Sequence, residues 1–211
     1  MSIAISDDHV ALRDTARRFT ASRCTPAVVR AALDGEAGDG APRPVPFWFE
    51  LADLGWLGLA VAEADGGQGY GFAELAVVLE ELGRAMAPGP ALATAWAASV
   101  APSYLTPDIL RGTLAGGVDP GPALAATADR DERVLVTGTT GLLLGACNVV
   151  VLPIVVEGEE CWCICDLTTE AAIVASELAS LDATRRLVRY ELRDVGAARL
   201  PGLTRGRVEA V

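Results

Sequence analysis

The chain has 211 residues, 51% of them hydrophobic and 21% charged, which is enough apolar material for one large folded domain or two small ones. This composition excludes a largely disordered chain, a collagen and a continuous coiled coil. The 28 acidic residues outnumber the 17 basic ones and give a formal net charge of −11. We therefore expect neither nucleic acid nor a membrane surface as a partner, because both attract positive charge.

Residue types that are scarce narrow the chemistry further. Every basic residue is an arginine, which excludes Lys Schiff bases and a P-loop lysine. His9 is the single histidine and argues against a Ser-His-Asp relay or a multi-histidine metal site. The first eight residues predict no secretory signal, and the odd count of five cysteines favours a reducing, cytoplasmic setting.

Apolar residues recur with helical period in the first half of the chain. Ser6 is a predicted N-cap for a helix that runs to about Arg23, followed by a loop-like stretch to Pro46. Further helices are expected over residues 47–54, 72–83 and 91–100, with Glu80 and Glu81 mostly off the apolar stripe. Thr106 and Pro107 predict the start of a short helix through Leu114.

β-Branched runs and alternation dominate after residue 118. The most apolar stretch, residues 142–156, is too short for a membrane helix and predicts a buried strand pair. Strands are expected at Ala123–Thr127, Arg133–Thr137, Val149–Val156, Cys161–Asp166, Ala172–Ser176 and Leu187–Arg193. The sequence thus predicts an α+β chain with a helical domain (residues 1–118) and an antiparallel β-barrel or sandwich domain (residues 119–211), with a boundary at residues 116–122.

Several local sequence patterns could form a ligand-binding site, and each also has a purely structural explanation. Residues 66–71 (GGQGYG) are glycine-rich enough to hold phosphate, but no strand precedes them, so a turn before the next helix is preferred. Alternation places Cys161, Cys163 and Cys165 on one face of a strand. Their spacing is not that of a zinc site, so we interpret them as side chains packed on the sheet. We predict no metal site.

Three charged patterns are interpreted in the same way. Asp129, Asp131 and Glu132 are too few for a calcium loop and predict a solvated hairpin turn. The pair at residues 185–186 suits a phosphate or, as preferred, ion pairing on the surface. His9 is expected in a first helical turn or on a helix surface. None of these patterns names a reaction.

Three separated segments resemble the acyl-CoA dehydrogenase family, and together they extend over nearly the whole chain. They are residues 56–69 (WLGLAVAEADGGQG), residues 78–90 (VLEELGRAMAPGP), and residues 181–187 (LDATRRL) followed by Asp194 and Val195. The resemblance implies an N-terminal helical domain, a middle β-domain and a C-terminal helical domain. It also implies FAD, an acyl-CoA substrate, a glutamate that removes the α-proton, and hydride transfer to the flavin.

The chain departs from the family where the flavin would bind. The family's "TEP…GSD" segment matches Thr127, Ala128 and Asp129, with only the threonine kept, and Ala126 beside it also falls at a flavin-binding position. The Pro of the family's "PE-x-x-GG" loop is Ala62. Its aromatic and hydroxyl positions in the next flavin segment are Leu142 and Leu144. We expect the C-terminal helical domain to be absent, no catalytic base to be assignable, and FAD binding by this chain alone to be doubtful.

Three hypotheses follow from the resemblance. The chain is part of a flavin-dependent dehydrogenase of fatty acyl or sterol side-chain thioesters, as a homo- or hetero-oligomer with a longer subunit. Alternatively it is a non-catalytic structural partner, or a fragment without a function of its own. If a helical domain is missing, an apolar patch is expected on the helices around Leu75–Leu82 and Ala91–Val100.

Overall fold

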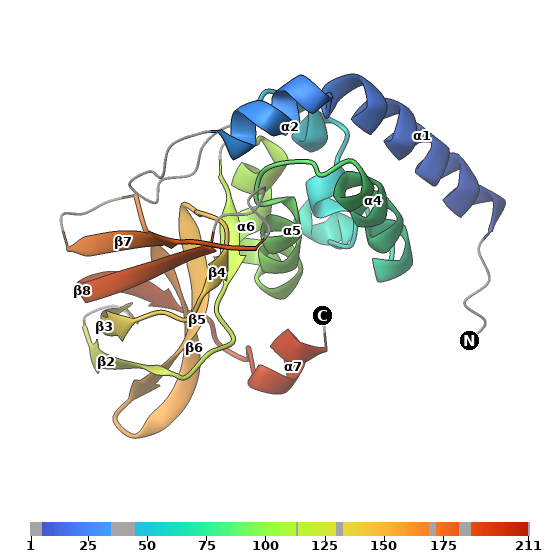
Figure 1. Ribbon diagram of the computed structural model, residues 1–211. Coiled ribbons are helices and arrows are strands. Elements are labelled where there is room, and N and C mark those ends of the chain that lie inside the picture. The colour runs from blue at the N-terminus through green and yellow to red at the C-terminus, as the bar shows by residue number, and fades with distance from the viewer. Residues whose placement is uncertain are drawn as a thin grey trace.

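The computed structural model describes residues 6–34, 45–112, 114–129, 133–168, 172–181 and 187–210. Helices form the first half and a β-barrel the second, so the predicted α+β architecture is confirmed (Figure 1). None of the described helices is long and apolar enough to cross a membrane.

The helical half begins with two consecutive helices at its outer side. Helix α1 (Asp7–Arg23) starts at Ser6 as predicted, with a capping box formed by Ser6 and His9. Helix α2 (Pro26–Leu33) lies where we predicted a loop, and this expectation was wrong. Thr25 caps α2 and Pro26 occupies its first turn, where a missing N–H costs nothing.

The remaining helices pack around a shared core. They are α3 (Trp48–Asp53), the 3₁₀ turns η1 (Trp56–Gly58) and η2 (Glu63–Asp65), α4 (Phe72–Arg84), α5 (Ala91–Val100) and α6 (Pro102–Leu110). Helix α6 begins four residues before the predicted cap at Thr106, and Pro107 lies inside it. Pro102 provides the favourable first-turn proline, so the predicted start was misplaced.

Within the described residues of the second half, eight strands make up one sheet. They are β1 (Gly116–Val118), β2 (Leu124–Ala128), β3 (Arg133–Thr139), β4 (Leu143–Leu144), β5 (Val149–Val156), β6 (Glu159–Asp166), β7 (Ile173–Leu178) and β8 (Leu187–Arg199). The six predicted strands are all present, and β4 with β5 accounts for the apolar stretch at residues 142–156. In β8, side chains alternate between buried and exposed as expected, with Val188, Tyr190 and Leu192 inside.

Strand pairing closes the sheet into a barrel. β5 pairs with β2, β2 with β3, β3 with β8, β8 with β6, and β6 with β5 again. Most pairs are antiparallel, but β1 and β2 both run parallel to β5. A nearly uniformly buried strand such as β5 is typical of parallel pairing, which the expected hairpin pattern did not anticipate.

The two halves share a core at their junction. Trp162 of β6 is 1% exposed and packs within the helical core cluster, together with Val118, Val151 and Val208. Thr94 of α5 accepts a hydrogen bond from the Gly116 N–H of β1 (3.2 Å). The boundary predicted near residue 118 stays a prediction, and β1 itself is hydrogen-bonded into the sheet.

A short final helix, α7 (Arg205–Glu209), returns from the barrel to the helices (Figure 1). Arg205 donates to the carbonyl oxygens of Pro120 (2.7 Å) and Gly121 (3.2 Å) and lies 5.8 Å from the centre of the Trp162 ring. Trp96 Nε1 donates to the carbonyl of Val208 (3.4 Å). Helix α7 therefore contacts both halves of the molecule.

Candidate functional site

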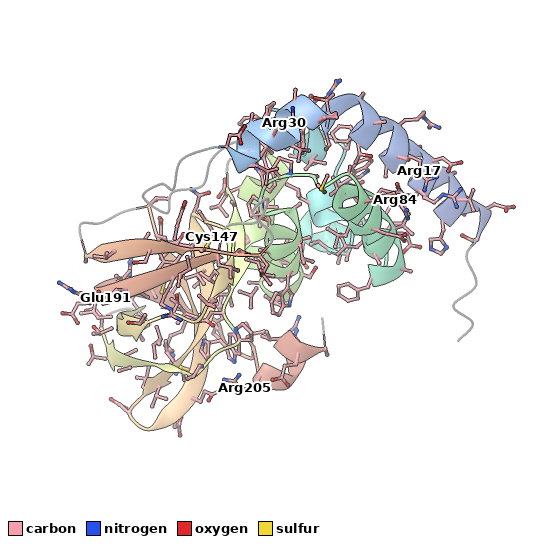
Figure 2. The ribbon with its side chains drawn as sticks, viewed as in Figure 1. Arg17, Arg30, Arg84, Cys147, Glu191 and Arg205 are labelled. Carbon is pink, nitrogen blue, oxygen red and sulfur yellow. The ribbon has the colours of Figure 1, made fainter. Side chains whose placement is uncertain are left out.

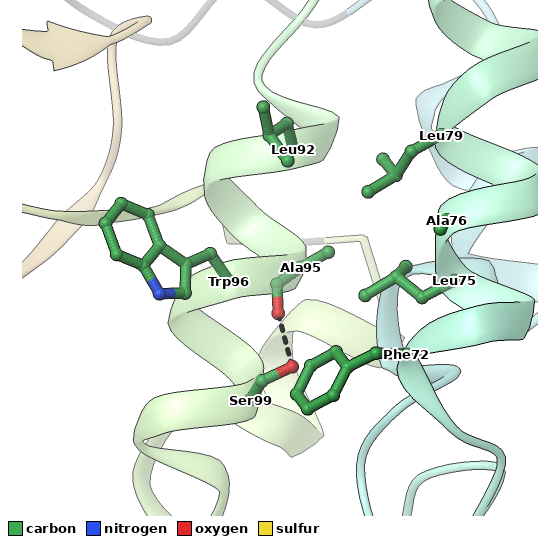
Figure 3. Close-up of a pocket in the computed structure, with 8 residues that line it drawn as sticks. All are labelled: Phe72, Leu75, Ala76, Leu79, Leu92, Ala95, Trp96 and Ser99. Carbon is green, nitrogen blue, oxygen red and sulfur yellow. Dashed lines mark hydrogen bonds between the residues drawn. The ribbon is translucent and has the colours of Figure 1, made fainter. Parts of the chain in front are cut away.

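An apolar groove of about 280 Å³ lies between α4 and α5 (Figure 3). Its walls are Phe72, Leu75, Ala76 and Leu79 of α4, and Leu92, Ala95, Trp96 and Ser99 of α5. Phe72 and Leu92 are 47% and 38% exposed. Exposed apolar side chains are therefore present on both helices, and the apolar patch that we expected there stays a prediction.

The four residues at flavin-matching positions lie in two places. Ala126 and Thr127 are on β2, whereas Leu142 lies in the connector before β4 and Leu144 on β4 itself. In the sheet, β3 and β8 lie between β2 and β4, so the two pairs are not on neighbouring strands. Ala126 packs against the barrel core, while Thr127 is exposed.

These positions do not fit the polar edge of a flavin ring. Leu142 and Leu144 are 46% and 43% exposed and have no side-chain hydrogen-bonding atom. Only Thr127 offers a hydroxyl, and its neighbour Ala126 offers none. Each absent, well-aligned hydrogen bond removes about 1–3 kcal/mol of recognition. The side chains at these two places therefore do not supply the flavin contacts that the resemblance implied.

A buried aspartate that the sequence reasoning missed holds the connector with Leu142. Asp119 is 2% exposed, and its carboxylate accepts the N–H groups of Gly121 (2.9 Å) and Gly141 (2.7 Å). A Cβ atom at Gly141 would come within 2.6 Å of the Asp119 Oδ1 atom, so glycine is needed there. The 22-residue separation of Asp119 and Gly141 hides this contact from any local pattern.

Tyr190 anchors the same connector from β8. Thr140 donates its N–H to the Tyr190 carbonyl (2.9 Å) and accepts the Tyr190 N–H at its hydroxyl (3.0 Å). The Tyr190 hydroxyl accepts the N–H of Cys147 (3.1 Å), beyond β4. Burial raises the pKa values of the Tyr190 hydroxyl and of the Cys147 thiol, the latter to about 12, so both are neutral side chains. Figure 2 shows Cys147 near the junction of barrel and helices.

Two carboxylates are buried in the described part of the chain, and neither is a free base. Glu81 is 1% exposed, contrary to our expectation that it lies off the apolar stripe. It accepts two hydrogen bonds from Arg17 (2.7 and 3.1 Å) and contacts Arg84. Figure 2 labels these two arginines, on α1 and α4. The bonds from Arg17 lower the pKa of Glu81. Asp119 is the other, and its oxygens hold the two backbone N–H groups.

The glycine-rich loop at residues 66–71 is a turn, as preferred. Its N–H groups donate to backbone carbonyls, for example Gly67 to Ala62 (3.0 Å) and Gly69 to Val61 (2.8 Å). A Cβ atom at Gly67 would lie 2.2 Å from the Val61 oxygen, which explains the glycine by close packing. The loop therefore has no set of open N–H groups for phosphate, and α4 follows directly.

The other candidate residues have structural surroundings. Cys163 and Cys165 are buried with their sulfur atoms 3.9 Å apart, and Cys161 is partly exposed. No group of three metal-binding side chains converges within the described ranges. Asp131, Glu132 and residues 182–186, with the arginine pair, lie outside the described residues.

His9 lies in the first turn of α1, as expected, but it also links two helices. Its Nδ1 accepts the Ser6 N–H (3.0 Å), so Nε2 is the atom that donates to Glu74 of α4 (2.9 Å). Glu74 in turn accepts the Gly71 N–H (2.9 Å) at the start of α4. This network is a helix cap and a contact between helices.

Comparison with known proteins finds the acyl-CoA dehydrogenase family. Residues 6–107 match the model of the acyl-CoA dehydrogenase N-terminal domain. The acyl-CoA dehydrogenase FadE34 of Mycobacterium tuberculosis is 30% identical over 209 residues, which cover 91% of this chain and 27% of that protein. The chain thus spans about a quarter of that relative's length.

Two solved structures share the fold. The ChsE4-ChsE5 complex from Mycobacterium tuberculosis superposes with a TM-score of 0.77 at 19% identity, over 96% of this chain and 57% of the solved chain. A Tcur3481-Tcur3483 steroid ACAD variant gives 0.74 at 22% identity, over 94% and 58%. Residues 6–107 thus belong to the acyl-CoA dehydrogenase N-terminal domain family, and the curated relative that resembles the chain over 91% of its length is an acyl-CoA dehydrogenase.

Proposed function

We propose that this chain is a subunit of a flavin-dependent acyl-CoA dehydrogenase and that it acts only with a longer partner chain. The observation that carries the proposal is the set of side chains at the flavin-matching positions. Leu142 and Leu144 replace an aromatic and a hydroxyl side chain, and Ala126 lacks a polar group, so FAD and the catalytic base are assigned to the partner.

Two further observations support a partner. One of the similar solved structures is itself a complex of two differently named chains. An apolar groove left open on α4 and α5 is a feature that an interface would bury.

The proposed reaction is the α,β-dehydrogenation of an acyl-CoA thioester in fatty acid or sterol side-chain β-oxidation. One of the similar structures is a steroid ACAD variant, which favours a bulky acyl group as a first substrate to test. In this assembly the present chain would contribute packing surface and not a reacting group, because its buried carboxylates are engaged. We place the complex in the cytoplasm, where the five free thiols would stay reduced.

Co-expression tests this proposal. The chain is produced with each longer acyl-CoA dehydrogenase of the same genome, and the purified complexes are assayed with straight-chain and steroid side-chain acyl-CoA thioesters and an artificial electron acceptor. We expect turnover by one complex and none by the chain alone. Turnover by the chain alone would overturn the proposal.

A purely structural partner is the second candidate. It is favoured by the same leucines, since a subunit without flavin needs no catalytic groups. It predicts that the longer chain oxidises the thioester equally well by itself and that the present chain raises only its thermal stability. Full activity of the longer chain alone would decide for this role.

A further inference from the structure

We propose that Cys161 and Cys163 of β6 form a redox-sensitive pair, in which hydrogen peroxide oxidises Cys161 and Cys163 then closes a disulfide with it. This inference concerns the chain by itself and is independent of the proposed function and of any partner. It gives a role to the alternating cysteines of β6, which the proposed function does not use.

Strand β6 separates two environments. Trp162 packs within the core cluster of the helical half, whereas Cys163 and Cys165 belong to the barrel core and Cys161 packs against it. The three thiols therefore lie along one face of the strand, with Trp162 on the other. The Sγ atoms of Cys163 and Cys165 are 3.9 Å apart, so neighbouring thiols on this face can reach contact.

Solvent reaches only one of these three thiols. Cys161 is partly exposed, whereas Cys163 and Cys165 are both 0% exposed. A dissolved oxidant therefore meets Cys161 first, because exposure controls which thiol reacts. The contact with Cys165 and burial raise the pKa of Cys163, and the nearby Cys161 adds to this rise. Cys163 thus stays a protonated thiol that reacts with a sulfur atom beside it and not with a solute.

Arg199 gives Cys161 a cationic neighbour. This arginine lies opposite Cys163 in the register of β8 with β6, and its Nη2 atom donates to the Cys161 Sγ atom (3.6 Å). In the part of the chain that the structure describes, no carboxylate pairs with Arg199. A thiol attacks peroxide as its thiolate, and partial exposure beside a guanidinium is typical of reactive cysteines.

The reaction takes two steps, with hydrogen peroxide as the oxidant. The Cys161 thiolate attacks one peroxide oxygen, the O–O bond breaks, and the departing hydroxide takes up the proton that Cys161 lost, which leaves Cys161 as a sulfenic acid. Cys163 then attacks this sulfur, so that an S–S bond forms, the S–O bond breaks, and the hydroxyl leaves as water with the Cys163 proton. The two thiols lose two electrons, and the peroxide is reduced to two waters.

The spacing along the strand predicts a strained and reversible disulfide. Residues two apart on a strand have Cα atoms about 6.6 Å apart, which is near the upper limit of roughly 6.8 Å for a disulfide. Strand β6 therefore has to bend to close the bond, and strained disulfides are readily reduced. Trp162 lies between the two cysteines and is 1% exposed in the shared core, so the bend would loosen the junction of barrel and helices.

Matched cysteine substitutions provide the test. The reduced chain is treated with one equivalent of hydrogen peroxide, its mass is measured, and differential alkylation identifies the oxidised thiols. We expect a loss of two hydrogens confined to Cys161 and Cys163, which dithiothreitol reverses. Cys161→Ala should slow this loss on the order of tenfold or more. Cys165→Ala removes a thiol of the same face that also contacts Cys163, and it should leave the rate unchanged.

Two further measurements separate this chemistry from the reaction of a merely accessible thiol. Arg199→Gln should slow the alkylation of Cys161 by iodoacetamide several-fold, whereas Arg189→Gln, at another exposed arginine of β8, should not change it. The oxidised chain should melt at a lower temperature than the reduced chain, because of the strain in β6, and dithiothreitol should restore the higher value.

Four results would overturn the proposal. One is a gain of oxygen on Cys161 without a disulfide, and another is a disulfide between Cys163 and Cys165 that forms as fast in Cys161→Ala. The third is oxidation of Cys24 or Cys147, which are 8% and 2% exposed, at the rate of Cys161. The fourth is a disulfide that leaves the melting temperature unchanged, since β6 would then not have bent.

Discussion

Replacing Trp162 by alanine should destabilise the whole chain, since this side chain joins the barrel to the helices. Trp162 is on β6, is 1% exposed and lies in the core cluster of the helical half. A buried tryptophan removes roughly 150–250 Å² from water, which at about 25 cal/mol per Å² is ~4–6 kcal/mol. Measured aromatic-to-alanine changes in cores cost about 3–5 kcal/mol.

We therefore expect Trp162→Ala to lower the unfolding free energy by roughly 3–5 kcal/mol. In a chain of this size, that corresponds to a fall in Tm of roughly 6–20 °C. Urea and thermal unfolding followed by circular dichroism measure both values. Tyr104→Ala is the matched control, because Tyr104 is 50% exposed on α6 and its loss should change stability little.

Two results would refute the shared core. One is a loss of less than about 1 kcal/mol for Trp162→Ala, equal to that of the control. The other is two separate unfolding transitions in the unmodified chain, of which Trp162→Ala shifts only the one belonging to the barrel. Either would mean that the helices and the barrel are stabilised independently.

Five further substitutions test individual contacts of the fold. Asp119→Ala leaves two backbone N–H groups without their acceptor and should lower the free energy of unfolding in urea by roughly 2–6 kcal/mol. Asp119→Asn should lower it by less. An unchanged urea midpoint for Asp119→Ala would contradict the anchoring role of Asp119. Arg17 lowers the pKa of Glu81, so their pair adds stability above the unfolded carboxyl pKa and loses it as the pH falls through the lower folded value. Arg17→Met should therefore lower the urea midpoint most at neutral pH, with a deficit that shrinks toward about pH 3, and a deficit that grows in acid would be the wrong sign. Gly83→Ala should stabilise α4 by about 0.5–1 kcal/mol, since a Cβ atom there meets nothing within 4 Å. Gly67→Ala should destabilise the chain, because its Cβ atom would meet a backbone carbonyl at 2.2 Å. Melting temperatures of the two variants that shift in the same direction would contradict this contrast.

Elements with strong periodicity could be predicted from the sequence. The apolar stripes of α4 and α5 and the alternation in β8 are local patterns, and each element was found within a residue or two at its start. The end of β8 was not predicted correctly, because Gly196 and the two alanines after it do not alternate between apolar and polar residues. The family resemblance was also local, in the segments at residues 56–69 and 78–90.

A Thr-Pro pair by itself did not locate the helix starts: at Thr106–Pro107 it predicted a wrong start, and at Thr25–Pro26, where we predicted a loop, a helix does begin. Thr25–Pro26 and Thr106–Pro107 have the same form, yet the first begins α2 and the second lies within α6. The difference comes from Pro102, which begins α6 earlier and leaves Pro107 as an interior proline. A cap signal states where a helix can start, and packing decides which start is used.

Contacts between residues far apart in the chain could not be predicted from the sequence. The burial of Glu81 depends on Arg17, 64 residues away, and the role of Asp119 depends on Gly141. A single-sequence pattern has no information on such pairs, so Glu81 was assigned to the surface side of its helix. Parallel pairing of β1 and β2 with β5 is likewise a property of the whole sheet.

The central claim is that this chain does not hold the flavin itself, and the visible absorption spectrum of the purified chain tests it most directly. The spectrum is recorded for the chain alone and for its complex with a co-expressed longer acyl-CoA dehydrogenase. We predict no flavin bands from the chain alone and stoichiometric flavin in the complex. Near-stoichiometric flavin in the chain alone would contradict our interpretation of Leu142 and Leu144.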